Sequence, residues 1–306
     1  MVVQKIIKRK SELSSRISTD KIFDWIVVVL TVMILLIILY PLYFVIIASV
    51  SEPNAVNSGN VLLFPVSPGL YGYRYILSDN RIWVGYRNTI LYTVCGTMVG
   101  LITTLPGAYA LSRHDLRGGS IIMKILIFTM FFQGGIIPAY MLIRNLGLIN
   151  TPYVLMLVGS FTVFNLIIAR TYFRENIPNE LLEAALIDGC GTFRFFFSVV
   201  LPVSQAIIGV IALYYIVGHW NSFFSALMYV NNQKLYPLQL ILRDILLGSQ
   251  ALTTEGSDLS EIRDLMRIAE SIKYGIIIVS SLPVLVAYPF LQRYFVKGVM
   301  IGSIKG

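Results

Sequence analysis

Six long runs of apolar residues, separated by polar segments, dominate the pattern along the chain. They cover Phe23–Val50, Asn88–Leu111, Ile121–Ile143, Pro152–Ala169, Val203–Val230 and Tyr274–Phe295. A helix that crosses the roughly 30 Å hydrocarbon core of a bilayer needs about 20 apolar residues, so each run predicts a transmembrane helix. Gly134, Gly135 and Pro138 interrupt the third run and predict a break in its helix. The pattern therefore predicts an all-α integral membrane protein whose six transmembrane helices occupy residues 23–297.

The composition supports this interpretation. Hydrophobic residues make up 56% of the 306 residues and charged residues only 13%, and the mean hydropathy is +0.75. A soluble domain cannot bury so much apolar surface, which excludes soluble enzymes, DNA-binding proteins and disordered chains. The first run is longer than the 7–15 apolar residues of a signal peptide, so we interpret it as an anchor and first span. Cys95 and Cys190 have no partners at metal-ligand spacing, so no metal site is predicted.

The net charge of +8 is distributed unevenly between the polar segments. Fifteen of the 24 Lys and Arg residues fall in alternate segments that include both ends of the chain, and nine fall in the others. Lys and Arg accumulate on the cytoplasmic side of membrane proteins, so both termini are predicted to be cytoplasmic and no nucleic-acid partner is needed. This division gives a cytoplasmic N-terminal segment, two long extracytoplasmic loops and a cytoplasmic tail, at residues 1–22, 51–87, 231–273 and 298–306.

The two long loops differ in pattern. Residues 51–87 are rich in Pro and Gly and are predicted to be mostly irregular. In the second loop, apolar residues over Leu259–Ile272 recur at helical spacing and predict an amphipathic helix.

No catalytic residue is predicted. The sequence contains no H-E-x-x-H, G-x-S-x-G or Walker A motif, and no nucleophile–base set that would suit an intramembrane protease. His219 is the single ionisable residue deep in an apolar run. It is predicted either to form an interhelical hydrogen bond or to carry a proton. Ion-driven transporters usually need buried charges, so energy for any transport is expected to come from a partner.

A polar segment at residues 174–202, on the predicted cytoplasmic side, has its own pattern. Its latter part reads PNELLEAALIDGCGTFRFFFSVVLP. Asn179 is predicted to cap a short helix and Gly189 to end it in a left-handed conformation. Thr192 is predicted to cap a second helix that extends to Val200. On the residues alone, the segment is either a docking element for another protein or a loop packed beneath the bundle.

The stretch EAALIDGCGTFRFFFSVVLP resembles the EAA loop of permease subunits in binding-protein-dependent ABC importers, in which E-A-A, two residues, D-G, a variable stretch and L-P follow in order. The matching residues are Glu183, Ala184, Ala185, Asp188, Gly189, Leu201 and Pro202. Cys190 and Gly191 replace the usual small polar pair, and Ala206 stands where a Pro often follows.

Other stretches resemble the same family. RNT at 87–89 and AYALSR at 108–113 are similar to the start and end of its second span. HWNSF at 219–223 resembles the W-N-x-F of sugar-importing permeases, and residues 288–306 are similar to the tail of the maltose-type G subunit. Residues 134–151 resemble the subgroup associated with complex oligosaccharides.

The resemblance implies a type I ABC importer permease fold in the bacterial cytoplasmic membrane. It implies a non-catalytic, multi-pass subunit that forms half of the translocation path for a carbohydrate, with an oligosaccharide favoured. The implied partners are a second homologous permease in a heterodimer, two ATPase subunits, an extracytoplasmic solute-binding protein and membrane lipid. ATP and Mg²⁺ would be bound by the ATPases and no cofactor by this chain. The EAA loop would sit in a groove of an ATPase, and Gly302, Ser303 and Lys305 of the tail would reach between the ATPases.

The fifth run carries the main candidates for the substrate path. Small and polar residues recur on one helical face, at Tyr214, Gly218, Asn221 and Ser225. They are predicted either to line the path or to pack against another helix. Gln133, at the predicted break, is a second candidate because a broken helix at membrane depth lines a cavity or is buried in protein. Trp220 is predicted to contact lipid or a partner. The alternatives are a non-sugar solute in the same importer class, or an ion-coupled secondary transporter.

Overall fold

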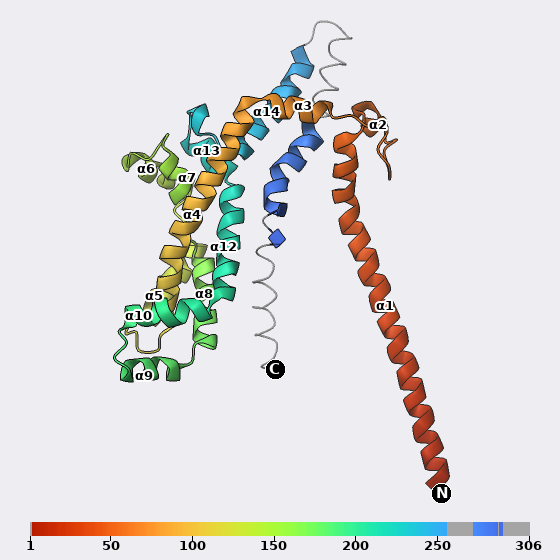
Figure 1. Cartoon of the computed structure of the whole chain (residues 1–306), viewed down its shortest axis with the longest axis vertical. Helices are drawn as coiled ribbons and strands as arrows, with labels where there is room; N and C mark the ends of the chain where they lie inside the picture. The colour runs from red at the N-terminus through yellow and green to blue at the C-terminus, as the bar shows by residue number, and fades with distance from the viewer. Residues whose placement is uncertain (1, 256–271, 287, 290–306) are drawn as a thin grey trace.

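The computed structural model describes residues 2–255, 272–286, 288 and 289 (Figure 1). Every regular element in these ranges is a helix, so the predicted all-α class is confirmed. In chain order the elements are α1 (Val2–Val50), α2 (Pro53–Asn57), α3 (Tyr71–Ser78), α4 (Asn80–Ser112), α5 (Gly119–Phe131), α6 (Ile136–Asn145), α7 (Pro152–Leu157), α8 (Val163–Asn176), α9 (Asn179–Ile187), α10 (Thr192–Phe195), the π-helix η1 (Phe196–Val200), α11 (Leu201–Val203), α12 (Gln205–Trp220), α13 (Phe223–Tyr229), the 3-10 helix η2 (Gln233–Leu235), α14 (Leu238–Glu255) and a C-terminal helix at Ile272–Val286.

Two helical segments are long and apolar enough to cross a bilayer unaided, namely Lys21–Val50 of α1 and the whole of α4. Two further pairs pass the same test together but are sharply bent. The chain bends by 111° between α5 and α6, and by 83° between residues 192–203 and α12. The described residues therefore hold two to four candidate spans by length and composition, and the count of six stays a prediction.

Helix α1 stands apart from the rest of the molecule (Figure 1). Its side chains from Lys21 to Leu42 are exposed on every face, and its contacts with the body lie at its C-terminal end. There the Phe44 ring packs edge-on against Tyr274 with 6.0 Å between ring centroids, and the Tyr73 hydroxyl donates a 2.8 Å hydrogen bond to Ser49 Oγ. An apolar helix exposed on all sides is suited to lipid or to another subunit.

Helix α4 is the central element, and α7, α8, α12 and α14 pack against it. A stripe of small residues on α4 allows this close approach. A Cβ atom at Gly96 would lie 2.4 Å from the His219 ring, and one at Gly100 would lie 2.8 Å from the Ser160 carbonyl oxygen. One turn further on, Thr104 Oγ1 and the Tyr215 hydroxyl form a buried 2.6 Å hydrogen bond.

The structure breaks several of the apolar runs that the sequence predicts as single helices. The break in the third run is confirmed, because α5 and α6 are separated by a turn in which Gly135 has φ +88°. Pro138 instead lies in the first turn of α6, where its missing N–H costs no helical hydrogen bond. The fourth run is also broken, because the chain leaves helical geometry after α7 and Gly159 has φ +86°.

The fifth run was predicted as one helix over Val203–Val230, and this is wrong at both ends. The π-helix η1 ends at Val200, Pro202 follows within α11, and the chain then bends before α12 begins at Gln205. Prolines and π-helices are the usual causes of such bends. Near the other end, α12 ends at Trp220 and α13 starts at Phe223.

The predicted extracytoplasmic loops contain more helix than expected. Residues 51–87 form α2, α3 and the start of α4, so the prediction of a mostly irregular loop is wrong. The second loop contains α14, which the sequence analysis missed, whereas the predicted helix at Leu259–Ile272 lies outside the described residues except for Ile272. The RNT stretch holds this loop, since Asn88 Nδ2 donates to the Lys234 and Tyr236 carbonyls and Thr89 Oγ1 accepts from the Leu238 N–H.

Trp220 was predicted to contact lipid or a partner, and the structure corrects this. Its side chain is buried in a cluster with residues of α14 and the C-terminal helix. The indole Nε1 donates a 3.0 Å hydrogen bond to the Ser280 carbonyl oxygen. The face of α12 opposite Gly218 is therefore covered by the chain itself.

We expect Gly100→Ala to lower the free energy of unfolding by about 1–3 kcal/mol, because the new methyl group would overlap the Ser160 carbonyl oxygen and the Tyr215 ring. Gly107→Ala, in the same helix, is the matched control. Its Cβ would lie 3.4 Å from the flexible end of Leu166, and its effect should stay within about 1 kcal/mol. Thermal unfolding of the purified chain in detergent measures both. Equal melting temperatures for the two variants would contradict the role given to Gly100.

Candidate coupling loop and translocation face

The coupling loop, residues 174–202, lies at the end of the molecule opposite α3 and α14 (Figure 1). Its first helix, α9, begins directly after Pro178, which takes an extended conformation and occupies the cap position. The predicted caps at Asn179 and Thr192 are each one residue off. Both residues are already helical, and Pro178 and Gly191 precede them in extended conformations, with no side-chain capping bond at either end.

The end of α9 is a Schellman motif. Gly189 has φ +71°, the left-handed conformation that its residue type predicts. The Cys190 N–H donates to the Ala185 carbonyl at 2.8 Å, and the Gly189 N–H donates to the Leu186 carbonyl at 3.1 Å. Ala185 and Cys190 also pack on the same hydrophobic cluster, which is the apolar contact that usually accompanies this motif. Cys190 therefore keeps the turn intact although it departs from the family pattern.

Aromatic side chains fix the second half of the loop to the helices. Phe195 and Phe196 are buried in a cluster with residues of α4, α8 and α12. The Tyr109 ring of α4 packs against two aromatic rings of this cluster. Its centroid lies 5.2 Å from that of Phe196 in the loop and 6.0 Å from that of Phe173 in α8. The sequence analysis missed these contacts, although the FRFFF stretch was a signal for burial. The loop is thus packed against three helices, α4, α8 and α12.

The motif residues themselves face outward. Glu183, Ala184, Asp188, Gly189 and Pro202 are exposed, whereas Ala185 and Leu201 are half-buried. Large apolar side chains extend this exposed surface, with Ile187 87% and Phe193 83% exposed. Apolar side chains gathered at one polar end of a molecule mark a contact with another protein.

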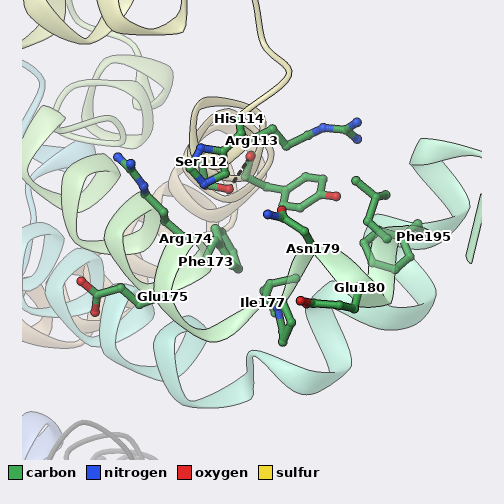
Figure 2. Close-up of a pocket in the computed structure, with 13 residues that line it drawn as sticks. Ser112, Arg113, His114, Phe173, Arg174, Glu175, Ile177, Asn179, Glu180 and Phe195 are labelled. Atoms are coloured by element: carbon green, nitrogen blue, oxygen red, sulfur yellow. Dashed lines mark hydrogen bonds between the residues drawn. The ribbon is translucent and has the colours of Figure 1, made fainter. Parts of the chain in front are cut away.

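A cleft of about 310 Å³ opens between the end of α4, the end of α8 and the start of α9 (Figure 2). Tyr109, Phe173 and Phe195 contribute aromatic surface, and charged side chains surround it at Arg113, Arg174, Glu175 and Glu180, beside the His114 imidazole. Arg113 also hydrogen-bonds the Asp115 carboxylate through Nε at 2.8 Å. This hydrogen bond lowers the pKa of Asp115 below its ordinary value, so the pair is ionised at neutral pH. The N-terminal end of α9 therefore borders a cleft with charged side chains around its opening.

Two of the predicted path residues, Tyr214 and Gly218, lie on α12, and Asn221 follows directly after its end. Tyr214, Gly218 and Asn221 are exposed and form what we call the path face. The Phe164 ring of α8 packs edge-on against Tyr214, with 6.0 Å between ring centroids, and a Cβ at Gly218 would meet no heavy atom within 4 Å. Ser225 lies on α13, beyond the break that begins at Asn221, so the four predicted residues do not share one continuous helical face.

The remaining candidates are placed as follows. Gln133 is exposed in the break between α5 and α6. His219 is buried, and its Nε2 lies 3.3 Å from Ser160 Oγ in the connection between α7 and α8. Gly302, Ser303 and Lys305 lie outside the described residues. Within the part of the chain that the structure describes, no three His, Cys, Asp or Glu side chains are placed to bind a metal ion.

Comparison with known proteins agrees with this arrangement. Residues 82–301 match the family model described as binding-protein-dependent transport system inner membrane component. The chain is 38% identical over 288 residues to the polygalacturonan/rhamnogalacturonan transport system permease protein YtcP of Bacillus subtilis (strain 168), covering 94% of this chain and 99% of the relative. It is 36% identical to Protein LplC of the same organism, covering 87% and 89%.

A solved structure is also similar. It is the crystal structure of a bacterial ABC transporter involved in the import of the acidic polysaccharide alginate, and one of its chains matches with a TM-score of 0.79 and 32% identity. The match covers 90% of this chain and 98% of that one. The predicted type I permease fold is confirmed, and the chain belongs to the family of inner membrane components of binding-protein-dependent transport systems.

Proposed function

We propose that this chain forms half of the path through which an ATP-driven importer moves an oligosaccharide across the membrane. As a permease subunit it is membrane-embedded and non-catalytic, and an ATPase and a solute-binding protein are its partners. The observation that carries the proposal is the exposed α9 surface, which bears the EAA motif and is fixed by Phe195 and Phe196 to the helices beside the path face.

The cargo is inferred from the relatives. YtcP is named for polygalacturonan and rhamnogalacturonan, and the structural neighbour for alginate. AraQ of Halalkalibacterium halodurans, named for arabinooligosaccharides, is 25% identical over 303 residues. These names share a carbohydrate polymer or its fragments, which supports an oligosaccharide cargo. The path face is suited to such a cargo, because Tyr214 offers a ring for stacking and Asn221 an amide for hydroxyl groups.

The coupling proposal follows from how the loop is attached. Glu183, Ala184, Asp188 and Gly189 would enter a groove of the ATPase, together with Ala185 and the L-P pair at Leu201 and Pro202. ATP and Mg²⁺ would be held by that ATPase. When the ATPases close, the loop would move as a rigid body and carry α4, α8 and α12 with it. Ligand-driven motion needs contacts that differ between the two states, and an exposed helix end offers them.

Further parts of the proposal concern the assembly. The second permease would be a homologous but different chain, with lipid around the pair and both termini in the cytoplasm. Gly302, Ser303 and Lys305 would contact the ATPases. Gln133 and Ser225 are proposed as further path residues, because a break at membrane depth must be lined by water or protein.

Affinity purification of the tagged chain in mild detergent tests the assembly directly. Mass spectrometry of the eluate should identify an ATPase and a second permease. The purified complex in vesicles, supplied with its binding protein, should accumulate labelled oligosaccharide only when ATP is present. A chain that elutes alone and transports without an ATPase would refute the importer proposal and favour ion-coupled transport.

We expect Gly189→Val to reduce ATP-dependent uptake by about tenfold or more. The left-handed conformation costs an L-residue about 1–2 kcal/mol, and a loss of 1.4 kcal/mol corresponds to a factor of ten in an equilibrium. Gly191→Val is the matched control, because Gly191 is equally open to solvent but has an ordinary extended conformation. Uptake in vesicles and retention of the ATPase on the affinity column are the two measurements. Unchanged uptake by Gly189→Val would contradict the coupling role.

We expect Gly218→Trp to block uptake while ATP hydrolysis stimulated by the binding protein continues. A Trp side chain would project from the path face into open space, so it would obstruct the cargo without displacing a neighbour. Ile102→Trp on α4 is the control, since Ile102 is also exposed at membrane depth but lies off that face. If uptake falls equally in both variants, or in neither, the path face is misassigned.

A further inference from the structure

An apolar segment between α2 and α3 has no role in the function proposed above. Residues 61–66 read VLLFPV. Val61 is buried and anchors one end of the segment, whereas Leu62, Leu63 and Phe64 are 63%, 58% and 76% exposed. Between Glu52 and Arg74 the chain carries no charged residue. Three consecutive large apolar side chains exposed to water would be unfavourable, at about 25 cal/mol for each Å² left uncovered.

The segment is held against the side of α1. The Tyr40 hydroxyl donates a 3.3 Å hydrogen bond to the Leu62 carbonyl oxygen, and the Tyr43 hydroxyl donates a 2.5 Å bond to the Leu63 carbonyl oxygen. A backbone hydrogen bond holds the C-terminal end of the segment near the end of α1, since the Glu52 N–H donates to the Val66 carbonyl at 2.9 Å. In Figure 1 the chain after α2 descends beside the C-terminal end of α1.

The position of these tyrosines along α1 sets the depth of the segment. Tyr40 and Tyr43 precede the end of the helix at Val50 by ten and seven residues, which is about 10–15 Å at 1.5 Å per residue. The chain carries no charge between Asp24 and Glu52, and a 30 Å hydrocarbon core takes up about 20 residues of helix. Counted from Asp24, that core ends close to Tyr43, so Leu62 and Leu63 lie at its boundary.

The hydrogen bonds fit this depth. A backbone carbonyl without a partner is costly where water is scarce, and here two carbonyls of an irregular segment are each satisfied by a tyrosine hydroxyl of α1. Tyrosine is itself enriched where the hydrocarbon core meets the headgroups. The exposed apolar side chains also continue the surface of α1, which is exposed on every face over Lys21–Leu42.

We propose that residues 61–66 form an apolar wedge that inserts into the bilayer leaflet at the C-terminal end of α1 and contacts lipid acyl chains. The wedge gives α1 a point of attachment besides the contacts of Phe44 with Tyr274 and of Ser49 with Tyr73. It thereby fixes the depth of a span whose side chains from Lys21 to Leu42 are exposed on every face. Lipid is the occupant because the wedge is uncharged and continuous with the apolar surface of a membrane helix.

Spin labels at Leu63→Cys and Phe64→Cys test the wedge in the full chain, purified with its partner subunits and reconstituted in phosphatidylcholine–phosphatidylglycerol vesicles. Cys95 and Cys190 are replaced by Ala in all samples. Collision with oxygen, which partitions into lipid, is compared with collision with a water-soluble nickel chelate. Ile37→Cys on α1 and Asn54→Cys on α2 supply the lipid and water references.

Both wedge labels should collide with oxygen several-fold more than with the chelate, as Ile37→Cys does. Tyr40→Phe combined with Tyr43→Phe should increase label mobility at position 63, because the hydroxyl bonds are lost. Chelate collision equal to that at Asn54→Cys would place the segment in water and overturn the proposal. Low collision with both reagents at both labels would show that a partner protein covers the segment, and would overturn it as well.

Discussion

The close approach of neighbouring helices to α4 is the constraint on which the other features of this structure depend. Lipid tails are as apolar as the side chains of a membrane helix, so no hydrophobic force drives the helices together, and packing and interhelical hydrogen bonds must do so. Gly96 and Gly100 remove the side chains that would hold α12 away. Thr104 and Tyr215 then form a hydrogen bond that only this separation allows. The aromatic cluster under the coupling loop and the path face are both built on helices that α4 positions.

The breaks in the helices are the second feature, and two of them are compensated locally. Between α7 and α8, the Asn165 N–H donates to Thr162 Oγ1, and the Tyr215 hydroxyl accepts a long bond from the Thr162 N–H. At the end of α12, Ser222 Oγ donates to the His219 carbonyl. Irregular backbone at membrane depth is tolerated only when its polar groups find such partners or line a cavity. Tyr215 thus stabilises both the contact with α4 and the break beside it.

The sequence was sufficient for the helical class, for the left-handed turn at Gly189 and for the break at Gly135, because each depends on a local property of the chain. It was insufficient for Trp220, for the bend before Gln205 and for the burial of Phe195 and Phe196. In a soluble protein an apolar face indicates burial. In a membrane protein lipid and protein both favour apolar residues, so periodicity does not distinguish the face of α12 that the C-terminal helix covers from a lipid-facing one. The predicted cap positions were off by one residue because Asn179 and Thr192 are the residue types that usually cap helices. The residues that take the extended cap conformation, Pro178 and Gly191, carry no stronger signal in the sequence.

Helix α12 connects the two surfaces to which we assign coupling and the substrate path, and its shape bears on how they would communicate. Its first half contributes Ile207 and Ile211 to the cluster that holds the coupling loop, its second half carries Tyr214 and Gly218, and Asn221 follows directly after its end. The helix has 16 residues, about 24 Å at 1.5 Å per residue, and no proline within it. The bend at its start, by contrast, follows a π-helix and Pro202, where the backbone has fewer regular hydrogen bonds to lose. In the coupling proposed above, a rotation of the loop would reach α12 through its contacts at Ile207 and Ile211 and would be carried along this unbroken helix towards the path face.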